Sequence, residues 1–232
     1  MTDFVFDPPA PVSLPVVGGN GRFPVRRIYC VGRNYVEHAQ EMGFTGREPP
    51  FFFCKPTDAI VFVPQGGTGE IPYPSMTKNF HFEAELVVAI GKPGANIRKE
   101  DAQQHVFGYA VGLDMTRRDL QGEMKKQGRP WEIGKAFDHS APIGPLHPVE
   151  RTGELSRAAI TLDVNGQRKQ SSDISKLIWN VAETIEHLSA YYTLQPGDLI
   201  YTGTPEGVGA VASGDVMVVA IEGLGELKVR VA

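Results

Sequence analysis

The pattern of apolar and polar positions is most informative in FHFEAELVVAIGK, residues 80–92. A short, nearly continuous apolar run of this kind predicts a buried strand. Two acidic residues, Glu83 and Glu85, interrupt it. Because strand side chains alternate between faces, both carboxylates are expected to point to the same side. Two like charges on one face repel each other and are costly to bury, so the pattern calls for a partner.

Similar apolar runs predict further strands along the chain. One segment, AAITLDVNGQRKQSS, predicts a hairpin, because Asn165-Gly166 fits a type I′ turn. The other expected strands are RRIYCVG, FFFCKP, AIVFVP, HVFGYAVGLDM, GDLIYTGTP, DVMVVAIEG and GELKVRVA.

Helical spacing of apolar residues is rarer. The longest example predicts a helix over 173–192, with one apolar stripe. A second helix is expected after Asp114, with Thr116 as N-cap, Asp119 at the third position and Gly128 after its end. A short third helix covers RNYVEHAQEMG, and residues 129–157 are expected to be largely irregular.

Strands therefore outnumber helices, and the helices do not alternate regularly with them. This order argues against a doubly wound parallel sheet and predicts a β-rich α+β fold. Residues 1–24 are rich in proline and glycine and are expected to form an N-terminal arm. Residues 25–232 are expected to form a single domain.

The composition limits the classes of partner that the protein could bind. The 232 residues carry a formal net charge of -4, which gives no general attraction to nucleic acid or to an anionic membrane. No apolar run approaches a membrane span, and no secretory leader is recognisable. Cys30 and Cys54 lie in apolar strand-like runs, which favours two buried thiols over a disulfide. These observations predict a soluble cytoplasmic protein.

A divalent cation would explain the paired glutamates. Residues i and i+2 of a strand lie close enough for two carboxylates to share one ion, and hard oxygen ligands suit Mg²⁺, Mn²⁺ or Ca²⁺. Asp114, which ends another apolar strand, is the expected third ligand. Exposure on the wet face of an edge strand explains Glu83 and Glu85 equally well at this stage.

Two further groups of residues could carry chemistry. Arg118 and Gln121 are three apart on the helix after Asp114 and so share a face. His38 and Glu41 are also three apart, and a carboxylate-bound histidine is a good general base. In isolation, a solvated helix surface is the favoured interpretation of each pair, and the loop residue Lys135 is typical of a solvated lysine.

Six segments taken together resemble the fumarylacetoacetate hydrolase family, in the family's order, over roughly residues 25–232. They are YCVGRNYVEHAQEMG, FFFCKPTDAIV, HFEAELVVAIGK, GYAVGLDMTRRDLQ, IGKAFD and PGDLIYTGTPEGVG. The similarity is to the short, single-domain members, which act on acylpyruvates, fumarylpyruvate or oxaloacetate. It implies a rolled, mixed β-sheet core and a homodimer.

The resemblance also implies roles for single residues. The metal ligands would be Glu83, Glu85 and Asp114, and the pair that activates water would be His38 and Glu41. The groups that hold the substrate and its oxyanion would be Lys135, Arg118, Gln121 and Thr204, and we further expect Arg33 and Tyr35 to contact the substrate. The reaction would be hydrolysis of the C–C bond of a 2,4-diketo acid, with fumarylpyruvate favoured, in aromatic-compound degradation.

Other functions remain open at this stage. Decarboxylation of oxaloacetate or isomerisation of a hydroxymuconate-type diacid could use the same site. A non-enzymatic, metal-binding structural protein is the alternative from another class. The cation that would bind a second substrate carboxylate is also undecided, with Arg33, Arg47 and Lys55 as candidates.

Glycines flank the segment 33–47, which carries His38 and Glu41. Glycine permits large changes in dihedral angle, so the segment is expected either to act as a lid or to be a permanently docked helix.

Overall fold

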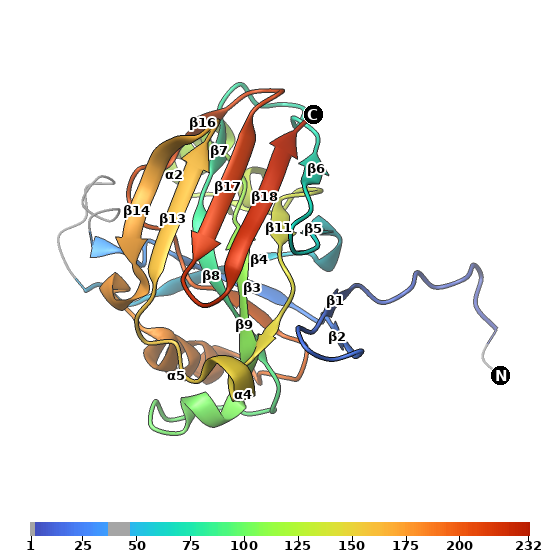
Figure 1. Ribbon diagram of the computed structural model, residues 1–232, viewed down its shortest axis with the longest axis vertical. Helices are drawn as coiled ribbons and strands as arrows, with labels where there is room; N and C mark the ends of the chain where they lie inside the picture. Colours follow the sequence, from blue (N-terminus) through green and yellow to red (C-terminus); the bar gives the residue numbers. More distant parts are fainter. Residues whose placement is uncertain (1–2, 37–46) are drawn as a thin grey trace.

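The structure is a computed structural model that describes residues 3–36 and 47–232 (Figure 1). Strands dominate the described part and form curled sheets with both parallel and antiparallel neighbours. The predicted class, a β-rich α+β fold with a rolled mixed sheet, is confirmed.

The largest sheet, which we call the inner sheet, has eight strands. Its central strand β8 (Ala84–Ile90) is buried at every position. Alternate residues of β8 belong to two different apolar cores, Leu86 and Val88 to one and Val87 and Ala89 to the other. Both faces of the inner sheet are therefore covered. The other strands are β4 (Phe51–Lys55), β3 (Ile28–Gly32), β15 (Leu199–Tyr201), β9 (Val106–Leu113), β11 (Ala141–Ile143), β5 (Ile60–Phe62) and β12 (His147–Pro148).

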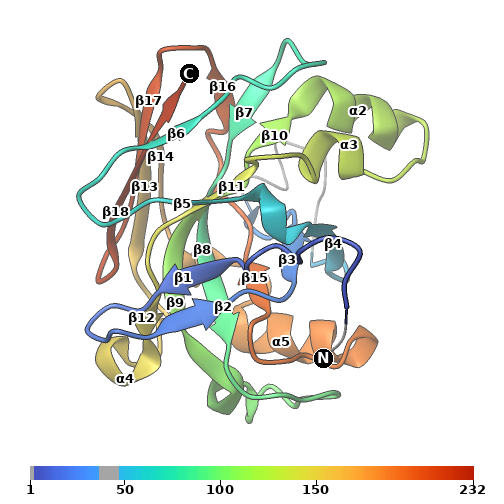
Figure 2. The same cartoon turned by 90° about the vertical axis from the view of Figure 1, so that its right-hand side faces the viewer.

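A second sheet of five strands, the outer sheet, lies across one face of the molecule (Figures 1 and 2). Its strands are β14 (Gln167–Asp173), β13 (Ala159–Val164), β17 (Val216–Ile221), β18 (Gly225–Val231) and β6 (Gly69–Ile71). The predicted hairpin joins β13 to β14, and its turn residues have φ of 51° at Asn165 and 77° at Gly166. Positive φ at both positions confirms the type I′ turn.

A third, small sheet contains β10 (Thr116–Arg117), β7 (Phe80–Phe82) and β16 (Gly209–Val211). The prediction of one continuous strand over 80–92 is therefore wrong. The chain leaves the small sheet after Phe82 and enters the inner sheet at Ala84, so Glu83 lies at the change of sheet. The apolar pattern cannot reveal this change, because both segments are buried and their partners are distant in sequence.

Helices lie at two ends of the molecule (Figure 2). The α-helices are α2 (Arg118–Lys126), α3 (Glu132–Lys135), α4 (Val149–Thr152) and α5 (Val181–Tyr191), and short 3₁₀ segments cover Thr57–Ala59, Ala102–His105 and Ile174–Lys176. The helix predicted over 173–192 begins only at Val181. The reason is the cap residue Asn180, whose side chain accepts a hydrogen bond from the backbone N–H of Glu183 at 3.0 Å.

The predicted N-cap of the second helix is also wrong. Thr116 belongs to strand β10, and α2 begins two residues later at Arg118. Gly128, with φ of 64°, follows the end of α2 as expected. The segment 129–157 is less irregular than predicted, because it contains α3, β11, β12 and α4.

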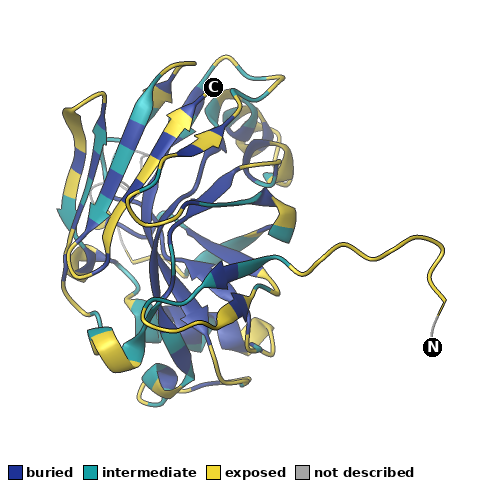
Figure 3. Ribbon diagram, turned by 45° about the vertical axis from the view of Figure 1, so that its right-hand side comes forward, coloured by how far each residue is buried: buried dark blue, intermediate teal, exposed yellow. Residues whose placement is uncertain are grey.

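The N-terminal segment protrudes from the body as an exposed, extended arm over residues 3–11 (Figure 3). Its continuation forms a hairpin of β1 (Ser13–Pro15) and β2 (Arg22–Pro24), which buries Leu14 and Phe23 against the inner sheet. The domain boundary at residue 24 stays a prediction.

Both cysteines are free, as predicted. Cys30 is buried, but Cys54 is exposed, so its predicted burial is wrong. Cys54 lies on β4, an outermost strand of the inner sheet. Among the described residues, no helix is long and apolar enough to cross a membrane.

Candidate active site

The three predicted metal ligands converge where the first residues of β8 meet the end of β9. One carboxylate oxygen from each of Glu83, Glu85 and Asp114 lies within 4.8 Å of the others. The backbone N–H of Asp114 donates to the carbonyl of Glu83 at 2.9 Å, which fixes the two strand ends together. All three side chains are buried, so they do not lie on a wet edge strand.

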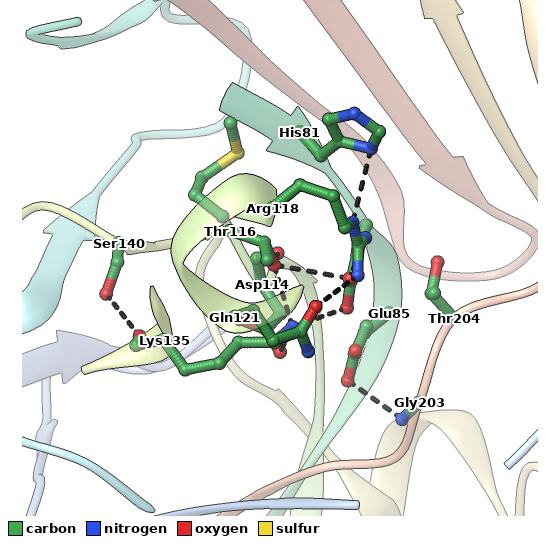
Figure 4. Close-up of polar contacts among 12 residues, drawn as sticks. His81, Glu85, Asp114, Thr116, Arg118, Gln121, Lys135, Ser140, Gly203 and Thr204 are labelled. Carbon is green, nitrogen blue, oxygen red and sulfur yellow. Dashed lines mark hydrogen bonds and ion pairs between the residues drawn. The ribbon is translucent and has the colours of Figure 1, made fainter. Parts of the chain in front are cut away.

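Burial makes this acidic cluster electrostatically costly. Desolvation, and then the charges of Asp114 and Glu83, raise the pKa of Glu85 well above its ordinary value. The backbone N–H of Gly203 donates to Glu85 Oε2 at 2.8 Å and partly offsets this effect (Figure 4). A set of hard oxygen donors with concentrated negative charge fits a divalent cation such as Mg²⁺ or Mn²⁺.

Lys135 reaches the cluster from the end of α3 (Figure 4). Its Nζ donates to Glu83 Oε2 at 2.8 Å, to Asp114 Oδ2 at 2.7 Å and to Thr116 Oγ1 at 2.7 Å. Burial alone would lower the pKa of Lys135, but the charges of Asp114 and Glu83 raise it overall. The predicted loop lysine is therefore a buried, protonated group beside two of the predicted metal ligands.

Close packing of α3 on α2 positions Lys135. A Cβ atom on Gly134 would lie 2.8 Å from the backbone nitrogen of Gln121, so only glycine allows this approach.

Arg118 and Gln121 share one face of α2, as predicted. The Arg118 guanidinium donates to Gln121 Oε1 at 2.6 Å and also to Glu83 Oε1. On its other side, Arg118 Nε lies 3.4 Å from His81 Nδ1. Burial, and then the charge of Arg118, lower the pKa of His81 to about 4. His81 is thus neutral at pH 7 and can accept this hydrogen bond.

Lys55 also belongs to this cluster. The sequence analysis named it instead as a candidate cation for a second substrate carboxylate. Its Nζ lies 2.8 Å from Asp114 Oδ1 and donates to Ser140 Oγ at 3.0 Å. Lys55 is buried against Asp114, a predicted metal ligand, and is not among the described residues that line the hollow at the trio. A lysine inside the apolar run FFFCKP was the available signal, because a lysine is rarely buried without a partner.

Thr204 lines the same hollow and is held by a residue of the outer sheet. Gln170 Nε2 donates to Thr204 Oγ1 at 2.9 Å and to the carbonyl of Pro205 at 2.8 Å. Its Oε1 accepts from the backbone N–H of Ala84 at 3.1 Å, next to Glu83. The sequence analysis missed Gln170, because its segment gave only a hairpin signal.

A hollow with an empty volume of about 330 Å³ is lined by the acidic trio, Lys135, Arg118, Gln121 and Thr204. Besides the groups already described, it is lined by Val31, Gly32, Arg33, Phe53 and Trp131. Tyr35 is buried near Glu85 but is not one of its described lining residues. Desolvation, and then the charge of Glu85, raise the pKa of Tyr35. Its substrate contact stays a prediction.

His38 and Glu41 lie outside the described residues, as does most of the segment 33–47. Their predicted roles, and the choice between a lid and a docked helix, stay predictions.

The fold and the site define a class: a curled β-sheet protein with a buried three-carboxylate site for a divalent cation, flanked by cationic and amide side chains. The sequence matches the family described as "Fumarylacetoacetate (FAA) hydrolase C-terminal" over residues 27–232. The chain therefore belongs to the fumarylacetoacetate hydrolase family.

Individual relatives refine this comparison. The chain is 49% identical to fumarylpyruvate hydrolase of a Ralstonia species, with 79% of this chain and 93% of that protein covered. It is 39% identical to oxaloacetate tautomerase YcgM of Escherichia coli, with 87% and 90% covered. Among solved structures, fumarylpyruvate hydrolase from Pseudomonas aeruginosa in complex with Mn²⁺ and pyruvate is 62% identical. The alignment covers 99% of both chains with a TM-score of 0.98.

Proposed function

We propose that the protein is a divalent-metal-dependent hydrolase that cleaves a C–C bond of a 2,4-diketo acid. The favoured substrate is fumarylpyruvate, which would be converted with one water to fumarate and pyruvate. The observation that carries the proposal is the buried trio of Glu83, Glu85 and Asp114 beside Lys135. Support comes from the 62% identical fumarylpyruvate hydrolase whose crystal structure holds Mn²⁺ and pyruvate.

The acidic trio would hold Mg²⁺ or Mn²⁺, with Ca²⁺ able to take its place. The bound cation would supply Lewis-acid chemistry at the carboxylate and 2-keto oxygens of the substrate. Thr204, held by Gln170, would donate a hydrogen bond to the substrate carboxylate. This arrangement would leave the 4-keto group on the side of the cationic residues.

Lys135, Arg118 and Gln121 would stabilise the negative charge that develops on the 4-keto oxygen. Two cations and an amide in a buried site are suited to this role, since preorganised donors are most effective where water is excluded. Neutral His81 would keep Arg118 in place, because its ring nitrogen can accept the hydrogen bond of Arg118 Nε.

His38, oriented by Glu41, would take a proton from water, and hydroxide would add to the 4-keto carbon. The bond between C3 and C4 would then break with its electron pair on the pyruvate fragment. The hydroxyl of water ends in the carboxylate of fumarate, and a proton completes the methyl group of pyruvate. Tyr35 would add a further substrate contact near Glu85.

Three finer points belong to the same proposal. A homodimer is supported by the exposed apolar side chains Phe4, Val5 and Phe6 on the protruding arm. A cytoplasmic location is supported by the two free thiols. A role in aromatic-compound degradation follows from the proposed substrate. Sedimentation analysis should give about twice the chain mass of 25.3 kDa.

The decisive experiment compares fumarylpyruvate, acetylpyruvate and oxaloacetate as substrates, each with Mg²⁺ and with Mn²⁺. We expect the highest kcat/KM for fumarylpyruvate, loss of activity with a chelator, and recovery when the metal is restored. Preference for oxaloacetate would instead favour tautomerisation, the function named for the Escherichia coli relative, or decarboxylation, according to the product formed. Specific metal binding without turnover of any substrate would favour a structural metal protein.

A further inference from the structure

A second hollow adjoins the site and is built mainly from aromatic side chains. Its empty volume is about 760 Å³, and its lining residues are Arg33, Phe51, Phe52, Phe53, Pro130, Trp131 and Glu132. Arg33, Phe53 and Trp131 line both this hollow and the one that contains the acidic trio. The two spaces are therefore neighbours with a shared wall.

The aromatic side chains of the shared wall lie between Lys135 and Arg33. Phe53 begins the wall, with its ring centroid 5.2 Å from Lys135 Nζ. Trp131 follows, at a centroid distance of 6.0 Å from Phe53 and 5.1 Å from Phe51. The Arg33 guanidinium carbon ends it, 5.1 Å from the Phe51 centroid and 5.8 Å from the Trp131 centroid. Flat aromatic surfaces thus connect Lys135 with Arg33.

The structure separates the three cations that could bind a distant substrate carboxylate. Lys55 is buried and lies 2.8 Å from Asp114 Oδ1. Arg47 pairs with Glu183 and lies 4.1 Å from the centroid of Trp179, and it lines neither hollow. Arg33 is the one of the three that lines both.

The backbone at Arg33 has an unusual conformation, and its neighbour is a glycine. Arg33 has a φ of 58°, a conformation that costs free energy for any residue with a Cβ and that clusters at functional sites. Its neighbour Gly32 allows Phe51 to approach, because a Cβ on Gly32 would lie 2.0 Å from the Phe51 ring. A single glycine thus brings the Phe51 ring against the strand that ends beside Arg33.

We propose that Arg33, with the walls of Phe51, Phe53 and Trp131, forms the subsite for the distal carboxylate of a planar, unsaturated acyl group. This inference rests on the proposed hydrolase function and names the substrate class within it. A conjugated acyl chain is flat and can lie against aromatic rings. A guanidinium can bind a terminal carboxylate through two parallel hydrogen bonds.

The surroundings of Arg33 are mixed in charge. Burial lowers the pKa of Arg33 and the charge of Glu48 opposes this, but a guanidinium stays protonated at neutral pH. Glu132 lines the hollow with the opposite sign. A carboxylate must therefore be bound by direct contact with Arg33, since the surrounding field is not uniformly positive.

The test compares Arg33→Gln with Arg47→Gln on two substrates, fumarylpyruvate with its terminal carboxylate and acetylpyruvate without one. Glutamine is unbranched like arginine and adds no new strain at this φ. In Arg33→Gln, kcat/KM for fumarylpyruvate should fall by roughly 10- to 100-fold, the range for one charged hydrogen bond. Acetylpyruvate should be cleaved as by the wild type, and Arg47→Gln should leave both substrates unchanged. Arg33→Lys should recover only part of the loss, because the planar fork is missing.

An equal loss on both substrates, or no loss on either, would overturn the subsite. Fumarate binding gives a readout independent of turnover, measured by calorimetry on Mn²⁺-loaded protein with pyruvate present. If the wild type cleaves neither substrate, the proposed hydrolase function fails. The subsite is then supported only if fumarate binds to the wild type at least 10-fold more tightly than to Arg33→Gln, and it is overturned if both bind fumarate alike or not at all.

Discussion

The inner and outer sheets differ in whether their charged side chains are buried or exposed to solvent. In the inner sheet, β8 is buried at all seven positions and still carries Glu85. In the outer sheet, β18 alternates between exposed and buried residues, and its charged side chains, such as Lys228, point outward. Charge is therefore solvated in the outer sheet and held by other charges in the inner one.

This difference indicates which part of such a fold can hold a metal ion. A carboxylate on a solvated face keeps its ordinary behaviour, whereas a buried one must be compensated by a cation or by hydrogen bonds. Lys135 and Lys55 compensate Asp114, and the Gly203 N–H serves Glu85. The strands covered on both faces thus create the electrostatic conditions for binding a metal, and the alternating strands do not.

Exchanging one carboxylate for an amide at the buried cluster and one on the outer sheet should have the most unequal effect. Asp114→Asn should nearly abolish metal binding and activity, with a loss well beyond the roughly 10- to 100-fold seen for partners of metal ligands. The control Asp163→Asn removes a partly exposed carboxylate of β13 that pairs with Arg168. Calorimetry with Mn²⁺ should find wild-type affinity in the control, and unchanged affinity in Asp114→Asn would disprove the ligand assignment.

Replacing one lysine at the buried cluster and one on the outer sheet sharpens the comparison for catalysis. Lys135→Met should lower kcat by about two to three orders of magnitude, the effect of losing one oxyanion donor. Lys228→Met, on the exposed face of β18, should leave kcat unchanged. Steady-state kinetics with fumarylpyruvate separates the roles, since a change in KM alone would make Lys135 a binding group.

Gln170 is an exception to the exposure of polar residues in the outer sheet, because this residue of β14 is fully buried. Gln170→Leu leaves the N–H of Ala84 and the hydroxyl of Thr204 without this partner. The expected loss of stability is about 1–3 kcal/mol, with a higher KM because Thr204 is no longer held. The exposed neighbour Gln167 provides the control, and Gln167→Ala should change stability by less than about 0.5 kcal/mol. Denaturant unfolding measures both, and equal stabilities would contradict the role of Gln170.

The smallest effect is expected at the start of α2. Burial alone would raise the pKa of Asp119, but hydrogen bonds from Lys78 N–H and Thr77 Oγ1 lower it overall. A carboxyl whose pKa is lower in the folded state stabilises the fold above its unfolded pKa, near 3.9, and this contribution is lost as the pH falls through the folded pKa.

Asp119→Asn should therefore cost about 0.3–1 kcal/mol at pH 7, as for an acid near a helix N-terminus. The gap in Tm between wild type and variant should begin to narrow below about pH 4 and should continue to narrow as the pH falls through the folded pKa. A gap that does not narrow at all on acidification would show that the charge of Asp119 is not the cause.

Local sequence patterns were sufficient for features that depend on neighbouring residues. The I′ turn at Asn165-Gly166 follows from backbone freedom. Acidic residues within or at the end of apolar runs suggested the trio of Glu83, Glu85 and Asp114, although exposure explained the two glutamates equally well until the family resemblance was considered. The capping hydrogen bond of Thr116 was mispredicted, because the same hydroxyl can bond a carboxylate instead, as it does to Glu83. A local pattern does not distinguish these two partners.

Features that depend on distant partners were not predictable in this way. The change of sheet at Glu83 is decided by which strands pair with β7 and β8. The contact of Lys55 with Asp114 joins residues that are far apart in the chain. A single sequence carries the apolar pattern of each segment but not the pairing between segments.

The backbone hydrogen bond that joins Asp114 to Glu83 has a consequence for binding energetics. Two of the proposed metal ligands are tied by the same network that holds the central strand β8 to β9. The described ligands therefore need no rearranged state of the scaffold in order to converge. When the conformation that binds the ligand is already the most populated one, no affinity is lost to a conformational change. The affinity for the cation should accordingly report the intrinsic strength of the oxygen ligands.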